Sequence, residues 1–405
     1  MSEFLIKNAH LEQVAYIITS LAMGGAQKVL LGLLANTQST TRPPLVISLL
    51  KTEGLQIEFA KLGIEVFYLE LEKPSLIFKK IATLKKIITE RQIKILYSFL
   101  HHANLFAVLL ATLSSKPKPA VIWGLHDTPV KKIYTRWQHR ALFYLGVRLS
   151  RIPHKIILVS ERSRQRYLEV GYPASSMELI PNGVPLSILQ AEQISLDRQA
   201  LRAELGLASD ALLIGSLTRA VPEKALPVML AAFAQLNSSP NTHLVLVGEG
   251  VDQDNTELQA QIAALGLQAR VHTLGIRHDP QHLIRGFDLA TLSSRSEAFP
   301  LFLVEAMALG IPCVATDVGD IALIFGGNGL LVPVNDSKSL ALAWLQVLAW
   351  NETEKQAKVQ AAWAYIQAHF SLERMQQHHW AVFTEVMAAC ESNQAWNMRI
   401  HHKRC

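Results

Sequence analysis

The stretch 296–310 combines two carboxylates with the signs of a helix start. Glu297 and Glu305 are separated by seven residues, and Pro300 stands near the beginning of an apolar run that predicts a helix. Proline lacks a backbone N–H, which costs nothing in the first turn of a helix. The free N–H groups of that turn and the helix dipole favour anions such as a diphosphate, and carboxylates accept hydrogen bonds from sugar hydroxyls. Either glutamate alone is typical of a solvated surface, but the whole stretch favours a site for a sugar diphosphate.

Arg219 and Lys224 form a second charged group, which follows the apolar run 212–217. The fork of an arginine and the point charge of a lysine suit the two phosphates of a diphosphate. Fixed cations of this kind stabilise the negative charge that a leaving nucleoside diphosphate gains in a transition state. Two solvated basic residues are the alternative, and the position after a predicted strand favours the phosphate site.

The elements that must position these side chains form two series of apolar runs, separated by helix-like segments. The runs of the first series are 14–21, 45–50, 65–71, 95–100, 121–124 and 155–160, and those of the second are 212–217, 243–247, 271–274, 289–292, 312–316 and 329–334. Nearly continuous apolar runs are typical of parallel strands that are covered on both faces. The alternation predicts an α/β fold of two Rossmann-like domains that face each other across a cleft, with ligands beyond the carboxyl ends of the strands.

The two series give the expected domain boundaries. We expect an N-terminal domain at 1–185 and a C-terminal domain at 186–370. Residues 371–405 are expected to form a C-terminal helix and a basic tail, with packing of the helix back on the N-terminal domain as one arrangement. The tail from Asn397 onwards is expected to be frayed.

Composition excludes several classes of protein. No apolar run of the 405 residues reaches the roughly 18–20 residues that span a bilayer, and the first residues lack the pattern of a signal peptide, so we expect a cytoplasmic protein. The three cysteines are few and far apart, which argues against a disulfide framework or a thiolate metal site. The net charge is +6 without a zinc-finger or RNA-binding signature, so nucleic acid is not an expected partner.

Seven stretches resemble, in the correct order, the motifs of one enzyme family. They are 23–29, 180–184, 218–224, 247–250, 296–310, 316–319 and 328–333. Together they resemble the retaining glycosyltransferases of GT-B fold in family 4 (glycosyl transferases group 1). The resemblance covers most of the chain, and it is specific for the family but only weakly specific for the sugar.

The resemblance implies roles for individual residues. Glu297 would hold hydroxyls of the donor sugar, Glu305 the ribose of the nucleotide, and Arg219 and Lys224 the diphosphate. The implied donor-binding set consists of Gly24, Gly25, Arg219, Lys224, Glu297, Ala298, Phe299, Pro300, Leu301 and Glu305. The implied catalytic set is Arg219, Lys224, Glu297 and His126, where His126 makes a polar contact with the donor sugar. Asn104, at another strand end, is a weaker candidate for the acceptor side.

The sequence departs from the family pattern at several positions. Alanine replaces the usual glycine after the glutamate and after the lysine of the two main motifs, and other changes replace glycine or glutamate. These departures are Ala298, Ala225, Thr218, Gln27 and Asp320. None of them removes a charge that phosphate binding requires, so they bear on donor identity more than on activity.

The implied reaction moves a hexose or N-acetylhexosamine, with retention, from a nucleotide-diphosphate sugar to a glycan or lipid-linked acceptor in the synthesis of cell-surface polysaccharide or lipopolysaccharide. No cofactor is expected. The sequence has no Asp-x-Asp motif for a cation, so we expect no metal. The alternatives are a nucleotide-sugar epimerase or phosphorylase of the same fold, and a non-catalytic nucleotide-sugar-binding protein. A phosphorylase would need a pyridoxal phosphate lysine, and the retained charged residues argue against a protein that has lost its activity.

Two basic segments of the N-terminal domain are interleaved with apolar residues. They are 77–88 and 131–137, and the second leads into 140–144. Each can form a helix that lies at the headgroup level of an anionic membrane, with Trp137 or Tyr144 at the interface. The alternative is that these helices cover a sheet and present solvated lysines. A weak contact with the inner face of the cytoplasmic membrane is therefore one expectation.

Overall fold

The computed structural model describes residues 11–35, 42–129, 137–186, 191–236 and 239–402. The chain divides into two compact units. Unit 1 comprises Met1–Gly183 and Leu372–Cys405, and unit 2 comprises Val184–Ser371. The chain therefore leaves the first unit near the boundary expected at residue 185 and returns to it with its last helix.

Parallel strands form the centre of unit 1. In the described residues the sheet has seven strands in the order β3-β2-β1-β4-β5-β6-β7. The strands are β1 (Val14–Ile18), β2 (Leu45–Ser48), β3 (Val66–Tyr68), β4 (Ile95–Phe99), β5 (Ala120–Leu125), β6 (Lys155–Leu158) and β7 (Met177–Leu179). Every residue of the central strands β1, β4 and β5 is buried, as expected for a sheet covered on both faces. The parallel sheet with alternating helices confirms the predicted fold class.

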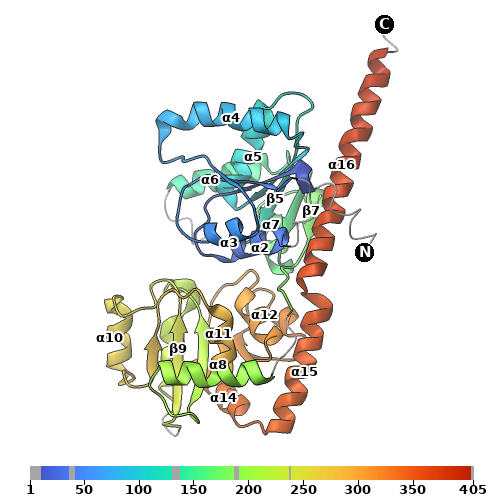
Figure 1. The fold of residues 1–405 in the computed structure, drawn as a ribbon. Helices are drawn as coiled ribbons and strands as arrows, with labels where there is room; N and C mark the ends of the chain where they lie inside the picture. Colours follow the sequence, from blue (N-terminus) through green and yellow to red (C-terminus); the bar gives the residue numbers. More distant parts are fainter. Residues whose placement is uncertain (1–10, 36–41, 130–136, 187–190, 237–238, 403–405) are drawn as a thin grey trace. The chain divides into compact units, whose positions relative to one another are not determined.

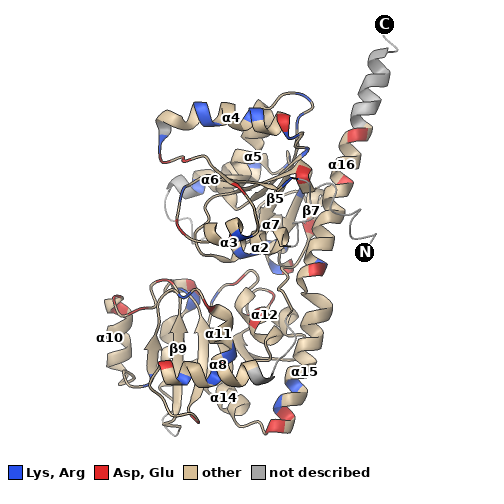
Figure 2. Ribbon diagram, in the orientation of Figure 1, with Lys and Arg blue, Asp and Glu red and all other residues tan. Residues whose placement is uncertain are grey.

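Helices cover both faces of this sheet (Figure 1). They are α2 (Gly25–Leu34), α3 (Gln56–Lys61), α4 (Ile77–Glu90), α5 (His101–Leu113), α6 (Trp137–Leu149) and α7 (Glu161–Glu169). Leu84 of α4 and Phe106 of α5 belong to one core with the strands, and Phe143 of α6 packs against it. Figure 2 shows Lys and Arg at intervals along α4. Helices α4, α5 and α6 therefore pack on the same core, which leaves their other sides to the surface.

The last helix, α16 (Leu372–His402), belongs to unit 1. The side-chain amide of Gln376 donates to the carbonyls of Gly32 at 3.0 Å and Ala35 at 2.9 Å, where α2 ends. It thereby adds a donor for carbonyl groups at the end of a helix, where the intrahelical donors run out. His379 Nε2 lies 3.1 Å from the hydroxyl of Tyr97 in β4. The expectation of a frayed tail from Asn397 was wrong for residues 397–402, because α16 continues to His402.

Unit 2 has a second parallel sheet, with the strand order β10-β9-β8-β11-β12-β13 in the described residues. The strands are β8 (Leu212–Leu217), β9 (Thr242–Val247), β10 (Val271–Thr273), β11 (Leu289–Leu292), β12 (Cys313–Thr316) and β13 (Leu330–Val332). The helices are α8 (Ala191–Glu204), α9 (Leu226–Phe233), α10 (Thr256–Ala264), α11 (Pro280–Gly286), α12 (Leu301–Ala308), α13 (Ile321–Phe325), α14 (Ser337–Leu348) and α15 (Glu352–His369). The strand order reverses between β8 and β11, where sheets of this type bind ligands.

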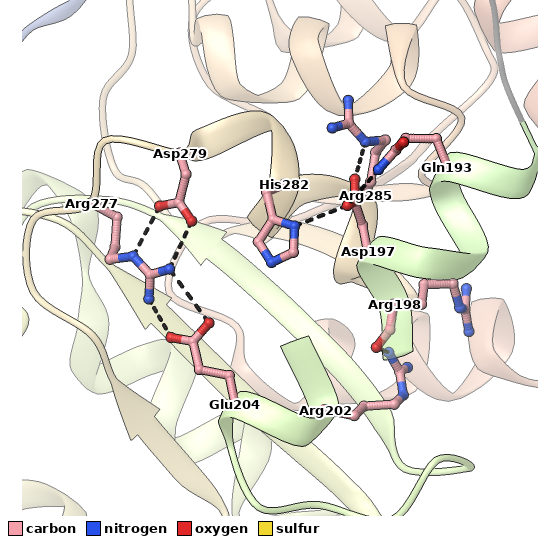
Figure 3. A network of polar contacts seen from close by, with 9 residues as sticks. All are labelled: Gln193, Asp197, Arg198, Arg202, Glu204, Arg277, Asp279, His282 and Arg285. Atoms are coloured by element: carbon pink, nitrogen blue, oxygen red, sulfur yellow. Dashed lines mark hydrogen bonds and ion pairs between the residues drawn. The ribbon is translucent and has the colours of Figure 1, made fainter. Parts of the chain in front are cut away.

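A polar network joins α8 to α11 and the loop before it (Figure 3). Asp197 of α8 binds Arg285, and its Oδ1 lies 3.0 Å from Nδ1 of His282. Arg277 lies between Glu204 and Asp279, with ion pairs to both carboxylates. The network fixes α8, the first helix of unit 2, against the helix that precedes β11.

Candidate functional site

The carboxyl ends of β8 and β11 bring two predicted site residues together. Lys224 ends a short 3-10 helix, Pro222–Lys224, that follows β8, and Glu297 lies in the loop after β11. The two strands are parallel neighbours, so both loops leave the sheet at the same edge. Lys224 Nζ lies 2.5 Å from Glu297 Oε1, and the side chains are 18% and 9% exposed. The ion pair links the predicted phosphate loop to the predicted sugar loop.

Two serines directly after β11 fix this arrangement. The hydroxyl of Ser294 donates to Oε1 of Glu297 at 2.6 Å, and the hydroxyl of Ser293 donates to the carbonyl of Lys224 at 2.9 Å. Thr316, at the end of β12, donates its hydroxyl to the carbonyl of Ser294 at 2.6 Å. Ser293 and Ser294 were not predicted as site residues, and Thr316 was predicted only as part of the motif 316–319. The signal was present, since each hydroxyl residue stands at or just beyond the end of an apolar run.

Two motif glycines allow other loops to approach the site closely. A Cβ on Gly319 would lie 2.3 Å from the carbonyl oxygen of Glu297, and a Cβ on Gly248 would lie 1.8 Å from that of Thr218. Both glycines have positive φ, at +56° and +139°. Any residue other than glycine would clash there through its Cβ, and its backbone would be strained. The motifs 316–319 and 247–250 therefore support the main chain of the two site loops.

Ala225, next to Lys224, adopts a left-handed conformation with φ 49° and ψ 44°. It occupies the position where the family usually has glycine. An L-residue with a Cβ is disfavoured in this conformation by roughly 1–2 kcal/mol. Ala225 is buried and ends the 3-10 helix that carries Lys224. This departure therefore places local backbone strain directly beside the proposed phosphate lysine.

The stretch after Glu297 leads into α12. Pro300 caps the helix, Leu301 begins it and Glu305 lies on its second turn. Phe299 is buried, with its ring 5.5 Å from that of Phe370. Ala298 and Glu305 are half-buried. The glutamates thus lie on either side of the first turn of α12, as the sequence predicted, although Pro300 precedes the helix instead of opening it.

Arg219 remains exposed in the loop after β8. Its main chain is fixed on both sides, because the N–H of Thr218 donates to Val247 and that of Ala220 donates to Glu249. The guanidinium makes no hydrogen bond or ion pair with any residue that the structure describes. The structure thus pairs Lys224 with Glu297 and leaves the charge of Arg219 at the surface.

The predicted glycines of unit 1 lie at the start of α2. Gly24 precedes the helix with an extended backbone, and Gly25 is its exposed first residue. A Cβ on Gly24 would lie 2.6 Å from Oε1 of Gln27. The amide of Gln27 donates to the carbonyl of Ser20 at 3.0 Å, which ties the helix to the end of the preceding strand. The glutamine that departs from the family pattern is therefore part of this turn.

His126 and Asn104 differ in the hydrogen bonds that their side chains make. Within the described part of the chain, both ring nitrogens of His126 are buried without a hydrogen-bond partner, and its ring stacks on that of Phe99 with 4.9 Å between the centroids. Burial lowers the pKa of His126 to about 3, so the ring is neutral near pH 7. Asn104 is 2% exposed and accepts a bond from Ser98 at 2.8 Å. The contact with a donor sugar stays a prediction for His126, and the geometry gives the acceptor-side role of Asn104 no support.

A polar group that the sequence analysis did not single out lies at the carboxyl ends of β4 and β5. His101 Nε2 lies 3.0 Å from Oδ2 of Asp127, and the hydroxyl of Tyr167 donates to Oδ1 at 2.7 Å. Burial alone would raise the pKa of Asp127, but His101 and these hydrogen bonds lower it to about 2. Burial lowers the pKa of His101, and the Asp127 charge outweighs that and raises it. His101 directly follows the predicted strand 95–100, and Asp127 stands three residues beyond the predicted strand 121–124, which was the available signal.

Two kinds of feature are absent from the described ranges, a metal-binding cluster and a membrane-spanning helix. No group of three or more His, Cys, Asp or Glu side chains there has an arrangement that could hold a metal ion. In the same residues, no helix is long and apolar enough to cross a membrane.

Comparison with known proteins places the chain in a family. The model of glycosyltransferase family 4 matches residues 24–188, and the model of glycosyl transferases group 1 matches residues 197–362. The chain belongs to the family 4 glycosyltransferases of GT-B fold. Each of the two models covers the main part of one unit, so both Rossmann-like domains of the fold are accounted for.

Individual relatives of this family 4 protein match over shorter stretches. An exopolysaccharide phosphotransferase, SCO2592 of Streptomyces coelicolor, is 33% identical over 197 residues, which are 46% of this chain and 19% of the relative. The lipopolysaccharide core biosynthesis glycosyltransferase LpsE of Rhizobium meliloti is 31% identical over 152 residues, which are 37% of this chain and 43% of the relative. The chain thus spans less than half the length of these curated relatives.

A solved structure shares the fold over almost the whole chain. It is that of Alr3699/HepE of Anabaena in complex with UDP and glucose, with a TM-score of 0.77 and 23% identity. The match covers 92% of this chain and 99% of that one. The likeness confirms the GT-B fold for both units.

Proposed function

We propose that this family 4 protein transfers a hexose or N-acetylhexosamine from a nucleotide-diphosphate sugar to a glycan or lipid-linked acceptor. The setting we propose is the synthesis of cell-surface polysaccharide or lipopolysaccharide. The observation that carries the proposal is the Lys224–Glu297 pair, 2.5 Å apart at the carboxyl ends of β8 and β11. The similarity to an exopolysaccharide phosphotransferase and to a lipopolysaccharide core biosynthesis glycosyltransferase supports this setting. The similar structure that was solved in complex with UDP and glucose supports the donor class.

In the proposed reaction, the bond from the sugar C1 to the donor phosphate breaks and a bond from C1 to an acceptor hydroxyl oxygen forms. The acceptor proton passes to the leaving diphosphate. Lys224 and Arg219 offset the negative charge that grows on that diphosphate. Glu297 accepts hydrogen bonds from sugar hydroxyls, and Ser294 orients the carboxylate by donating to it. Glu305 holds the ribose.

The remaining assignments follow the family resemblance. The main chain of residues 298–301 lies beside the donor, and Gly24 and Gly25 allow a close approach of backbone to donor or acceptor. His126 contacts the donor sugar through a ring nitrogen that has no hydrogen-bond partner among the described residues. We propose that the sugar keeps its anomeric configuration. Proton NMR of the product would test retention, because an inverted anomer shows a different coupling at C1.

The donor is best identified by mass spectrometry of reactions with several nucleotide sugars. UDP-glucose is the first to test, followed by sugars of other nucleotides and by N-acetylhexosamine donors. The assay detects both hydrolysis of the donor and transfer to added glycans. If no nucleotide sugar is bound or consumed, the proposed function is wrong, and a donor that is bound but never consumed supports a binding protein.

We further propose that the protein acts without a metal, on the cytoplasmic side of the membrane and in weak contact with it. Lys224, Arg219 and the N-terminus of α12 supply the positive charge that a cation supplies in other enzymes. Turnover is therefore expected to persist in an excess of chelator. An activity that disappears with EDTA and returns with magnesium or manganese contradicts this proposal.

A further inference from the structure

The loop after β11 holds the short 3-10 helix Pro222–Lys224 through the backbone carbonyls of that helix. Arg295 donates to the first two carbonyls, from its guanidinium Nη1 at 3.3 Å and from its main-chain N–H at 2.7 Å. The hydroxyl of Ser293 donates to the third carbonyl at 2.9 Å. The position of Lys224 therefore depends on the same loop that carries Glu297.

Arg295 also reaches a third loop. Its Nε donates to Oδ1 of Asn335 at 2.7 Å, in the turn that follows β13. Strand β12 lies between β11 and β13 in the sheet, so this one side chain connects the loops at the carboxyl ends of β8, β11 and β13. The guanidinium makes no ion pair with any residue that the structure describes. Its contacts therefore fix the directions of the loops instead of neutralising a charge.

The helix Pro222–Lys224 is a weak element by itself. The N–H of Lys224 donates to Val221 at 3.0 Å, and that of Ala225 donates to Pro222 at 3.3 Å. Hydrogen bonds in 3-10 helices have poorer geometry than those in α-helices. Ala225 also adopts the left-handed conformation, which is unfavourable for a residue with a Cβ. Hydrogen bonds from outside are therefore needed to hold the helix in one conformation.

The turn at the other end of the Arg295 side chain is fixed independently. Asn335 has a φ of 61°, which asparagine tolerates better than most residues. The next residue, Asp336, caps the 12-residue helix α14 by accepting the N–H of Ser339 at 2.9 Å. Arg295 thus connects the weak helix beside Lys224 to the start of a longer and capped helix.

We propose that Arg295 is a positioning residue of the donor site, which acts through Lys224 and does not itself contact the donor. It keeps the helix Pro222–Lys224 in the conformation from which the Lys224 ammonium reaches the donor diphosphate. Such a contact depends on fixed geometry, and a displacement of about 1 Å can cost on the order of a hundredfold in rate. The inference rests on the proposed function, because it requires that Lys224 binds a diphosphate.

Isothermal titration calorimetry of the full chain with UDP, GDP, ADP and dTDP tests the proposal without any acceptor. Arg295→Ala is expected to raise the Kd of the diphosphate that the wild type binds most tightly by at least about fivefold, as for the loss of a hydrogen bond from a charged group. Lys224→Ala should raise it further, because a displaced ammonium still attracts the phosphates whereas a missing one does not. Arg295 is exposed, so its substitution should leave the protein folded.

Two outcomes of this titration contradict different claims. An unchanged Kd in Arg295→Ala overturns the positioning role and leaves the proposed function standing. A folded wild type that binds none of the four diphosphates overturns both.

A double-mutant cycle separates positioning from a general loss of structure. If Arg295 acts through Lys224, Arg295→Ala should change the Kd by less than about twofold in protein that already carries Lys224→Ala, since coupled residues are not additive. Donor turnover in the same four proteins should show the same pattern. A full effect of Arg295→Ala in the Lys224→Ala background means that Arg295 acts on the donor directly or stabilises the whole site, and it overturns the inference.

Arg295→Lys tests geometry against charge. Lysine keeps the positive charge but lacks the planar fork whose N–H groups reach two acceptors at once. We expect Arg295→Lys to bind the diphosphate as weakly as Arg295→Ala. Recovery of the wild-type affinity in Arg295→Lys shows that a charge near the phosphates is sufficient, and it contradicts the positioning role.

Asn335→Gly removes the acceptor at the other end of the contact. Glycine tolerates the φ of 61° at this position, so the turn itself should persist. We expect a smaller loss of diphosphate affinity than in Arg295→Ala, and no further loss when the two substitutions are combined. Losses that simply add would show that Asn335 and Arg295 act separately, against the proposed contact.

Arg270→Ala is the matched control. Nη1 of Arg270 also donates to two carbonyls of a loop, at 3.2 Å to Leu236 and at 3.3 Å to Ser239. This loop precedes β9, so the contact lies at the amino end of the same sheet. Arg270→Ala removes an equal charge and comparable hydrogen bonds, and it should leave the diphosphate Kd unchanged. If it weakens binding as much as Arg295→Ala does, the effect is general and the positioning role is wrong.

Discussion

The two ends of strands β8 and β11 in unit 2 carry similar ion pairs in different surroundings. At the amino end, Asp288 pairs with Arg202 at 2.6 Å, and the two side chains are 4% and 3% exposed. The same carboxylate oxygen accepts the N–H of Leu213 at 2.7 Å, and the other oxygen binds Arg198. At the carboxyl end, Lys224 and Glu297 are 18% and 9% exposed.

The difference shows that an ion pair alone does not mark a site. The carboxylate of Asp288 is shared among internal partners that join α8, β8 and β11, so nothing remains for a ligand. The Lys224–Glu297 pair lies where parallel strands end and helix α12 begins, and where open α/β sheets bind ligands. Arg219 adds an exposed cation in the same loop as Lys224. A candidate site is therefore distinguished from a structural network by its position at the carboxyl ends of the strands and by its access to solvent.

The largest effect on stability is expected at the amino end. Asp288→Ala would leave Arg202 buried without its carboxylate, and breaking a buried ion pair in this way costs about 3–5 kcal/mol. Urea unfolding followed by circular dichroism measures the change, with Asp210→Ala at an exposed position as the control. Protein that remains folded should keep its affinity for the donor. A loss of donor binding in folded Asp288→Ala protein would break the distinction between the two ends.

At the carboxyl end, we expect a substitution to reduce turnover more than stability. Lys224→Ala should lower turnover at least tenfold, which corresponds to about 1.4 kcal/mol of barrier. The free energy of unfolding should fall by less than in Asp288→Ala, because this ion pair is more exposed than that of Asp288 and Ser294 still donates a hydrogen bond to Glu297. Lys338→Ala, at an exposed lysine of α14, is the control for the loss of one charge. Near-normal turnover in folded Lys224→Ala protein would remove Lys224 from the proposed site.

Much of the fold was predictable because its strands are apolar runs. The runs 14–21 and 95–100 contain β1 and β4, in which every residue is buried. Strand β7 was not predicted, since Met177–Leu179 is short and only half-buried. The length of α16 was underestimated because its last residues, such as Arg399 and His402, are polar and suggest a solvated tail. Its partners, the end of α2 and Tyr97, are far away in the sequence.

The part of the candidate site that was predictable consists of charged residues that follow apolar runs in the sequence. Glu297 and Lys224 each follow a strand, and the sheet topology brings them together. The hydrogen bond from Ser294 to Glu297 was not predictable, because it depends on side-chain direction within the loop. In unit 1, Asn104 also follows a strand, but its amide is buried between β4 and β5. Position at a strand end therefore predicts a site well for charged residues, which resist burial, and poorly for neutral ones.

The smallest expected effect concerns the hydroxyl of Ser294, which orients Glu297 at the carboxyl end of β11. Ser294 donates to Glu297 at 2.6 Å and is fully buried. Its loss in Ser294→Ala frees the carboxylate to turn and removes a bond to a charged group, for which about 1.5 kcal/mol is a typical contribution. We therefore expect the donor KM to rise by a few-fold to about tenfold, with the product unchanged.

Ser216 provides a matched control for this variant. It lies on β8, is fully buried, and its hydroxyl has no hydrogen-bond partner among the residues that the structure describes. Ser216→Ala removes the same buried hydroxyl without breaking a bond, so it should leave the donor KM unchanged and keep or raise stability. If Ser216→Ala and Ser294→Ala change the donor KM equally, the effect comes from general loosening of the sheet. If only Ser294→Ala changes it, the hydroxyl acts through the orientation of Glu297, and the carboxyl end of β11 differs from the amino end in serving the ligand.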